Sequence, residues 1–220
     1  MFKIKFCGIK DKDTANFLID NFSAYKLILG FRIGKRKHHS EISIEEANEI
    51  INTIDNKALP VIATYLKDSD KILELCKNFN TKWLQVTDLL ENSELTKLKE
   101  NGYNIVLSLN TSKINFEKNN KQLLTAYDLI ILTTNTFYPD WSKISFISSY
   151  IPYQKTFIGG WLHPESMLYA VKHVLPSGIN IDFNILNYTF GNTKNLIKYI
   201  NDFQKTFELF SNINGNGGRS

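Results

Sequence analysis

Short apolar runs recur eight times along this chain, and a segment with the pattern of a helix follows each of them. Several of the runs are almost wholly apolar, as is typical of parallel strands that are covered on both faces. Strands that alternate with helices in this way predict an α/β fold built around a parallel sheet. The eight runs are residues 3–9, 25–31, 59–65, 82–87, 104–109, 127–133, 155–158 and 178–182.

Eight strand–helix units favour a closed barrel over an open sheet. The chain has 220 residues, and a (β/α)8 barrel commonly takes about 200–250. The turn after the first strand lacks the G-x-G-x-x-G fingerprint of an open dinucleotide-binding sheet. We therefore expect a single (β/α)8 TIM barrel over residues 1–210, with its last helix over residues 192–210. Residues 211–220 have the composition of a flexible C-terminal tail.

Two helix starts carry recognisable signals. Ser43 is followed by Glu46 three residues later, which forms a capping box and predicts a helix that ends near Asp55. Asp140 is a suitable N-cap for a helix that continues to Tyr150.

The composition excludes several classes of protein. The formal net charge of +4 is mild and comes largely from Lys35, Arg36 and Lys37, so it does not indicate nucleic-acid binding. No segment is long and apolar enough to span a membrane, and the N-terminus lacks the form of a signal peptide. The two cysteines, Cys7 and Cys76, make no disulfide framework. We expect both to be reduced in a cytoplasmic protein.

Cys7 ends the first predicted strand and is the first candidate functional residue. In a barrel of this kind the chemistry lies at the C-terminal ends of the strands. The alternative is that Cys7 is a small buried hydrophobic residue. A reactive thiolate needs a cationic or polar neighbour, and no such neighbour of Cys7 is apparent from the sequence.

Several motifs resemble the phosphoribosylanthranilate isomerase family, in order and at matching spacing over nearly the whole chain. Lys5-Phe6-Cys7-Gly8-Ile9 is similar to the family's Lys-Ile-Cys-Gly-Ile opening. The remaining matches are Gly30-Phe31 at the second strand, Ile42 to Ala47 at a helix start, Asp140-Trp141, Gly159-Gly160, and Leu162 to Ser166.

The resemblance implies an Amadori rearrangement, an aldose-to-ketose shift on an aminated ribose phosphate in tryptophan biosynthesis, a branch of amino-acid biosynthesis. In the family a cysteine thiolate after the first strand is the general base, and Cys7 matches it. An aspartic acid after the sixth strand is the general acid, and that position falls on Thr133. A threonine hydroxyl does not supply a proton near neutral pH as a carboxylic acid does. The chain thus resembles a divergent paralogue.

The resemblance also places candidate substrate-binding residues. The family's loop arginine corresponds to Arg36, or to Ser40 if the residues are counted without a gap. The other matched binding positions, in the fourth, seventh and eighth strands and the loops after them, are Gln85, Gly159, Gly160, Trp161 and Asn184.

Asp182 stands where the family has a serine, close to the expected phosphate. A carboxylate there would repel a phosphate dianion by several kcal/mol, at an effective dielectric constant of about 20. Because the eighth strand neighbours the first in a closed barrel, Asp182 can also face Cys7 and replace the missing acid.

Two functions follow, and they belong to different classes. The first is an isomerase that acts on an aminated sugar phosphate or a related small ligand. The second is a barrel that has lost catalysis and serves as a small-molecule binding or protein-partner module. In either case we expect a small-molecule ligand at the C-terminal mouth, no cofactor, no metal, no nucleic-acid or membrane partner, and a monomer or homodimer. His38 and His39 lack partners with metal-ligand spacing.

Overall fold

The computed structural model describes residues 2–34, 40–113, 124–134, 139–160, 169–170, 173–183 and 193–215. All pairings between neighbouring strands are parallel. The strands are β1 (Lys3–Cys7), β2 (Lys26–Ile33), β3 (Glu41–Ile42), β4 (Leu59–Thr64), β5 (Trp83–Val86), β6 (Asn104–Asn110), β7 (Leu129–Thr134), β8 (Thr156–Gly160) and β9 (Gly178–Asp182).

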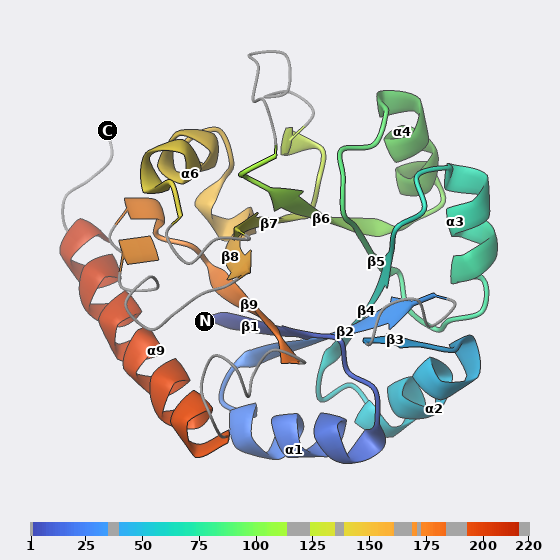
Figure 1. Ribbon diagram of the computed structural model, residues 1–220, viewed down its shortest axis with the longest axis horizontal. Helices are drawn as coiled ribbons and strands as arrows, with labels where there is room; N and C mark the ends of the chain where they lie inside the picture. The colour runs from blue at the N-terminus through green and yellow to red at the C-terminus, as the bar shows by residue number, and fades with distance from the viewer. Residues whose placement is uncertain are drawn as a thin grey trace.

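The sheet closes on itself, because β1 pairs with β2 on one side and with β9 on the other. Figure 1 looks along the resulting barrel, with the helices arranged around it. The short strand β3 is an addition beside the end of β2, where it pairs with Arg32 and Ile33. The prediction of a single (β/α)8 barrel is confirmed, and β3 is an element that the sequence pattern did not indicate.

Helices lie outside the barrel, and the two predicted N-caps, Ser43 and Asp140, are both confirmed. Ser43 and Glu46 form the predicted capping box, with Ser43 N donating to Glu46 Oε2 at 2.8 Å and Glu46 N donating to Ser43 Oγ at 3.2 Å. The described helices are α1 (Lys12–Phe22), α2 (Ile44–Ile54), α3 (Ser69–Cys76), α4 (Asn92–Glu100), α6 (Trp141–Ser148), the 3-10 turn η1 (Tyr153–Lys155) and α9 (Thr193–Gly215).

The last helix, α9, ends later than the sequence predicts. The expected end was Phe210, but the helix continues to Gly215. Residues 211–214 include neither glycine nor proline, and glycine is the residue type that most often follows the last helical turn. Residues 216–220, the remainder of the predicted tail, lie outside the described part of the chain.

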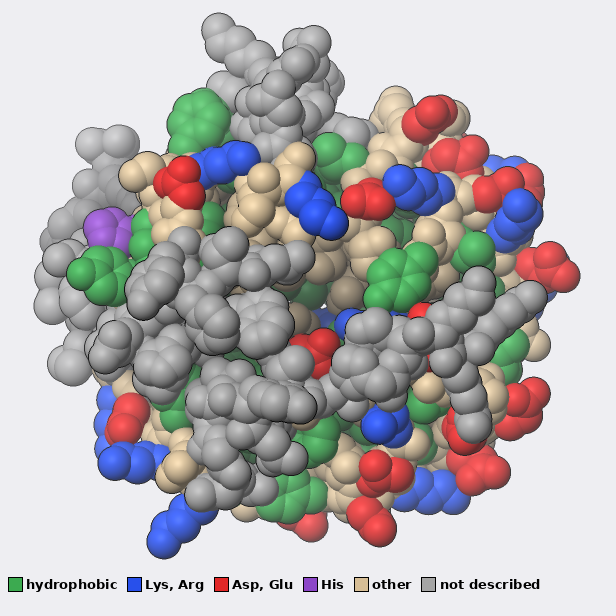
Figure 2. All heavy atoms as spheres, viewed as in Figure 1, with side chains coloured by type: hydrophobic (Ala, Val, Ile, Leu, Met, Phe, Trp, Pro, Cys, Tyr) green, Lys and Arg blue, Asp and Glu red, His purple; other side chains and the backbone are tan. Residues whose placement is uncertain are grey.

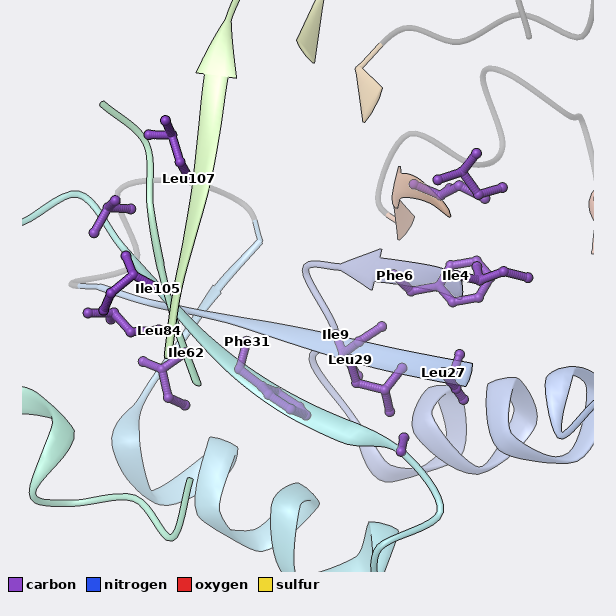
Figure 3. Packing of buried hydrophobic residues seen from close by; sticks show 14 of the residues in the cluster. Ile4, Phe6, Ile9, Leu27, Leu29, Phe31, Ile62, Leu84, Ile105 and Leu107 are labelled. Atoms are coloured by element: carbon purple, nitrogen blue, oxygen red, sulfur yellow. The ribbon is translucent and has the colours of Figure 1, made fainter. Parts of the chain in front are cut away.

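The apolar residues form two groups, one outside the barrel wall and one inside it. Figure 3 shows side chains of the outer group on β1 and β2, which pack towards the surrounding helices. The inner group fills the N-terminal half of the barrel and consists of Ile28, Val61, Val106, Leu129, Ile131 and Phe157. Each such side chain contributes roughly 1.5–3 kcal/mol when fully buried. The filled half leaves the C-terminal half of the barrel for polar groups.

No helix in the described ranges is both long enough and apolar enough to cross a membrane.

Candidate active site at the barrel mouth

Polar side chains gather inside the barrel where the strands end. Successive residues of a strand face opposite sides of the sheet. Ile4 and Phe6 belong to the outer core, so Lys5 and Cys7 on the same strand face inward. The register sets Cys7 between Gly30 on β2 and Asp182 on β9. The predicted proximity of Asp182 to Cys7 is therefore present.

Gly30 makes room for two functional groups. A Cβ atom at this position would lie 2.8 Å from Lys5 Nζ and 3.2 Å from Cys7 Sγ. Both distances are shorter than ordinary contacts, so a side chain at this position would displace the Lys5 amine or the Cys7 thiol. The amine and the thiol thus lie beside the same glycine.

Lys5 is fully buried, although it carries an ionisable amine. Its Nζ donates a hydrogen bond to Asn180 Oδ1 at 3.0 Å, and Asn180 is the register partner of Lys5 on β9. Burial lowers the pKa of Lys5 below its usual value, because an ammonium is poorly solvated there. The electrostatic influence of Cys7 and Asp182 opposes this lowering of the pKa.

Arg32 is the second cation at the mouth. Its Nη2 lies 3.7 Å from Asp182 Oδ2, and its Nη1 donates to Ser40 Oγ. Burial acts to lower the pKa of Arg32, but the charges of Cys7, Tyr65 and Asp182 together outweigh burial and raise it. Figure 2 shows basic and acidic side-chain atoms close together at the centre of this view.

Gln85 lies on the inner face of β5, and its side chain is incompletely paired. The residue is 5% exposed, and its Oε1 is buried without a hydrogen-bond partner among the described residues. An unpaired buried carbonyl oxygen costs about 1–3 kcal/mol unless a ligand or water donates to it.

The interior layer of the barrel that contains Cys7 is formed by small side chains. In a barrel of this type, alternate strands contribute the four side chains of each interior layer. Following the register from Cys7, the same layer contains Ala63 on β4, Ser108 on β6 and Gly159 on β8. The side chains of this layer are smaller than those of the inner apolar group.

Thr133 lies at the C-terminal end of β7, as predicted. Its Oγ1 donates to the backbone oxygen of Leu109 at 3.1 Å. Its own backbone oxygen accepts a hydrogen bond from Thr111 N at 3.0 Å. The only proton of the Thr133 hydroxyl is thus directed at the barrel wall.

Two of the remaining predicted residues are described, and three are not. Gly159 and Gly160 end β8, and Gly160 has φ of +100° with Thr134 O only 2.1 Å from an added Cβ, so this position requires glycine. Arg36, Trp161 and Asn184 lie outside the described residues. The described part contains no group of three or more His, Cys, Asp or Glu residues that could hold a metal ion.

The sequence alone did not reveal which basic residues lie near Cys7, and the structure places Lys5 and Arg32 there. Two signals in the sequence could have found them. Lys5 precedes Cys7 by two residues and therefore faces the same side of β1. Arg32 follows Gly30 by two residues, and parallel pairing places Gly30 beside Cys7.

Solved structures share this architecture over most of the chain. A phosphoribosylanthranilate isomerase from Thermotoga maritima, described as monomers generated from a dimeric enzyme, is 22% identical, with a TM-score of 0.70 over 94% of this chain and 99% of that chain. The enzyme from Thermococcus kodakaraensis is 16% identical, with a TM-score of 0.73 over 92% and 98% of the two chains. The chain has the phosphoribosylanthranilate isomerase fold.

A further structure holds a ligand. It is a phosphoribosylanthranilate isomerase in complex with reduced 1-(o-carboxyphenylamino)-1-deoxyribulose 5-phosphate, and it is 20% identical, with a TM-score of 0.68 over 98% of this chain and 100% of that chain. Neither a protein-family model nor a curated protein sequence matches the chain. At these identities the likeness concerns the fold, and function is argued from the residues at the mouth.

Proposed function

We propose that this protein is a divergent phosphoribosylanthranilate isomerase-like enzyme that moves a proton between neighbouring carbons of an aminated sugar phosphate or a related small anion. The observation that carries the proposal is the position of Cys7, at the C-terminal end of β1 between Gly30 and Asp182, with Arg32 paired to that carboxylate. Positive charge favours the thiolate, which is the form of cysteine that accepts a proton.

Each polar group at the mouth has a task in this reaction. Cys7 removes the proton from the carbon next to the imine that forms when the sugar ring opens. Arg32 attracts the anionic part of the substrate. Gln85 Oε1 accepts a hydrogen bond from a substrate hydroxyl, which satisfies an oxygen that is otherwise unpaired in the described part of the barrel.

The reaction also needs a general acid that opens the sugar ring. Thr133 stands at the family's acid position, and its hydroxyl points to Leu109 O. Asp182 is the carboxyl group that the register sets beside Cys7, so we assign it the acid's role. The ion pair with Arg32 holds this carboxyl group against the guanidinium and away from a substrate. We therefore expect slow turnover.

Repulsion between the Asp182 carboxylate and a substrate phosphate is weaker than the sequence suggests. Asp182 was expected to repel it by several kcal/mol. Arg32 carries the opposite charge 3.7 Å from that carboxylate and offsets much of its field at the mouth. A phosphate near the glycines that end β8 is compatible with this balance.

The hydrogen bond of Thr133 also favours a second candidate function, a barrel that binds a small molecule without converting it. A site that keeps its cations and its space but lacks a free acid is suited to binding alone.

Complementation of a tryptophan auxotroph that lacks this isomerase separates the two candidates. Growth with the wild-type chain, loss of growth with Cys7→Ser and unchanged growth with Cys76→Ala would support the enzyme. Cys76 is the matched control because it is buried in α3, away from the mouth. Absence of growth with the wild type and appearance of growth with Thr133→Asp would contradict the enzyme proposal and support the binding module.

A further inference from the structure

A second pocket lies outside the barrel wall, beside the C-terminal ends of β2 and β4 and next to the helices α2 and α3. Successive residues of a strand face opposite sides of the sheet. Arg32 faces the mouth, so Ile33 faces outward, and Thr64 faces outward because Ala63 belongs to the inner layer. Ile33 and Thr64 both line the pocket. The wall of the barrel therefore separates this pocket from the mouth.

The pocket exists because α2 and α3 are sparsely packed against each other. Helix α2 contacts α1, and α3 contacts α4, whereas contacts between α2 and α3 are few. Figure 1 shows α2 and α3 as neighbours outside the barrel. Asn48 Nδ2 on α2 donates to Asn78 O, just after α3, at 2.8 Å, which joins the two helices below the pocket. The gap that remains beside the start of α2 has a volume of about 680 Å³, within the range of about 300–1,000 Å³ that is typical of small-molecule sites.

The wall of this pocket is largely apolar and partly exposed. Ile33 and Leu75 contribute to it from β2 and α3. Tyr65 and Leu66, which also line it, are 51% and 37% exposed and are among the exposed large apolar residues of the described chain. Leu66 N donates to Thr64 Oγ1 at 3.2 Å, which holds the backbone of this turn in place. Apolar surface on a wall that is already formed favours the binding of an apolar ligand.

The charge at this pocket is negative. Glu41 on β3 and Glu45 in the first turn of α2 line it, and no Lys, Arg or His is among the described residues that do so. The Glu41 carboxylate lies against Gly34, which also lines the pocket. Lys67, in the loop after β4, pairs with Asp88 at 3.0 Å. Two carboxylates beside an apolar wall attract a ligand that carries a positive group on an apolar body.

We infer that this pocket is a second ligand site, which binds a small organic cation with an aromatic or apolar body. The amine of the ligand lies near Glu41 and Glu45, and its body packs against Tyr65 and Leu66. An ammonium close to the tyrosine ring gains a cation–π attraction in addition. The inference goes beyond the proposed function and is independent of it, because it uses none of the residues that take part in the proposed reaction.

Three small molecules of nearly the same shape test the charge preference on the wild-type protein. They are phenethylamine, phenethyl alcohol and phenylacetate, which are cationic, neutral and anionic near neutral pH. In NMR titrations the amine should bind about fivefold or more tightly than the alcohol, and the acid should bind most weakly. The amide shifts should centre on Glu45 and Leu66. Equal affinities for all three, no binding of the amine, or shifts centred on Cys7 and Asp182 at the mouth would overturn the inference.

The double variant Glu41→Gln/Glu45→Gln tests the two carboxylates. It should weaken the binding of phenethylamine by about fivefold or more, since each carboxylate near the surface contributes a modest attraction. Glu49→Gln is the matched control, because Glu49 lies one turn further along α2, pairs with Lys12 at 3.4 Å and does not line the pocket. It should leave the affinity unchanged. An equal affinity of the wild type and the folded double variant would overturn the role of the two carboxylates, and the wild-type titrations test the site even if the double variant does not fold.

Discussion

Arg32 and Asp182 set the charge that an anionic ligand meets at the barrel mouth. Both side chains are largely buried, at 15% and 26% exposure, so their charges act with little screening. The neighbourhood also contains Lys5 and Cys7. The mouth is therefore a balanced cluster in which removal of any one charge changes ligand affinity.

Asp182→Ser should tighten the binding of a ribose phosphate analogue by tenfold or more. The change removes a repulsive carboxylate and leaves Arg32 available to the phosphate, and tenfold corresponds to about 1.4 kcal/mol. Isothermal titration calorimetry measures this. Asp88→Ser is the control, because Asp88 is an exposed aspartate paired with Lys67, and affinity should not change. Low micromolar binding by wild type with no gain in Asp182→Ser would contradict the prediction.

At the residue scale the sequence predicts where a residue lies along its strand better than it predicts which side chains surround that residue. Cys7, Thr133 and Gly160 lie where the pattern places them, at strand ends. The proximity of Arg32 to Cys7 depends on which residues of β1 and β2 pair. Local patterns give the faces of each strand but not the register between strands, so this neighbour was missed.

At the element scale, α2 is held at its start by a reciprocal pair of hydrogen bonds between Ser43 and Glu46. These hydrogen bonds join the residue that follows the short strand β3 to the first turn of the helix. It fixes the chain just after the barrel mouth, where β3 adjoins the end of β2.

Ser43→Ala should lower the free energy of unfolding by about 1 kcal/mol, because the Glu46 backbone N–H loses its acceptor. Urea denaturation measures the change. Thr53→Ala in the last turn of the same helix is the control, since Thr53 Oγ1 donates to the carbonyl oxygens of Glu49 and Ile50 and accepts from no backbone N–H. An equal loss of unfolding free energy in the two variants would contradict a specific stabilising effect of the capping box.

Elements with strong local signals were predicted well, and those fixed by tertiary pairing were not. The capping box and strand β9, found at Gly178–Asp182 as expected, follow from residue types alone. Strand β3 has two residues and exists because Glu41 and Ile42 meet Arg32 and Ile33. No periodic pattern can develop over two residues.

At the scale of the whole molecule, closure of the barrel brings the two ends of the sheet together and creates the site. Cys7 lies on the first strand and Asp182 on the last, and they are adjacent only because β1 pairs with β9. The count of eight strand–helix units predicted this closure. The monomer or homodimer expected from the sequence stays a prediction.

In the proposed function this barrel moves a proton with Cys7 as the base. The most direct measurement is mass spectrometry of phosphoribosylanthranilate incubated with the purified protein in deuterated water. We predict conversion to the ketose product with deuterium at the carbon that gains the proton, and a rate about 10²–10⁴-fold lower for Cys7→Ser. Cys76→Ala should convert it as the wild type does. No conversion by the wild type, or equal rates for wild type and Cys7→Ser, would contradict the account.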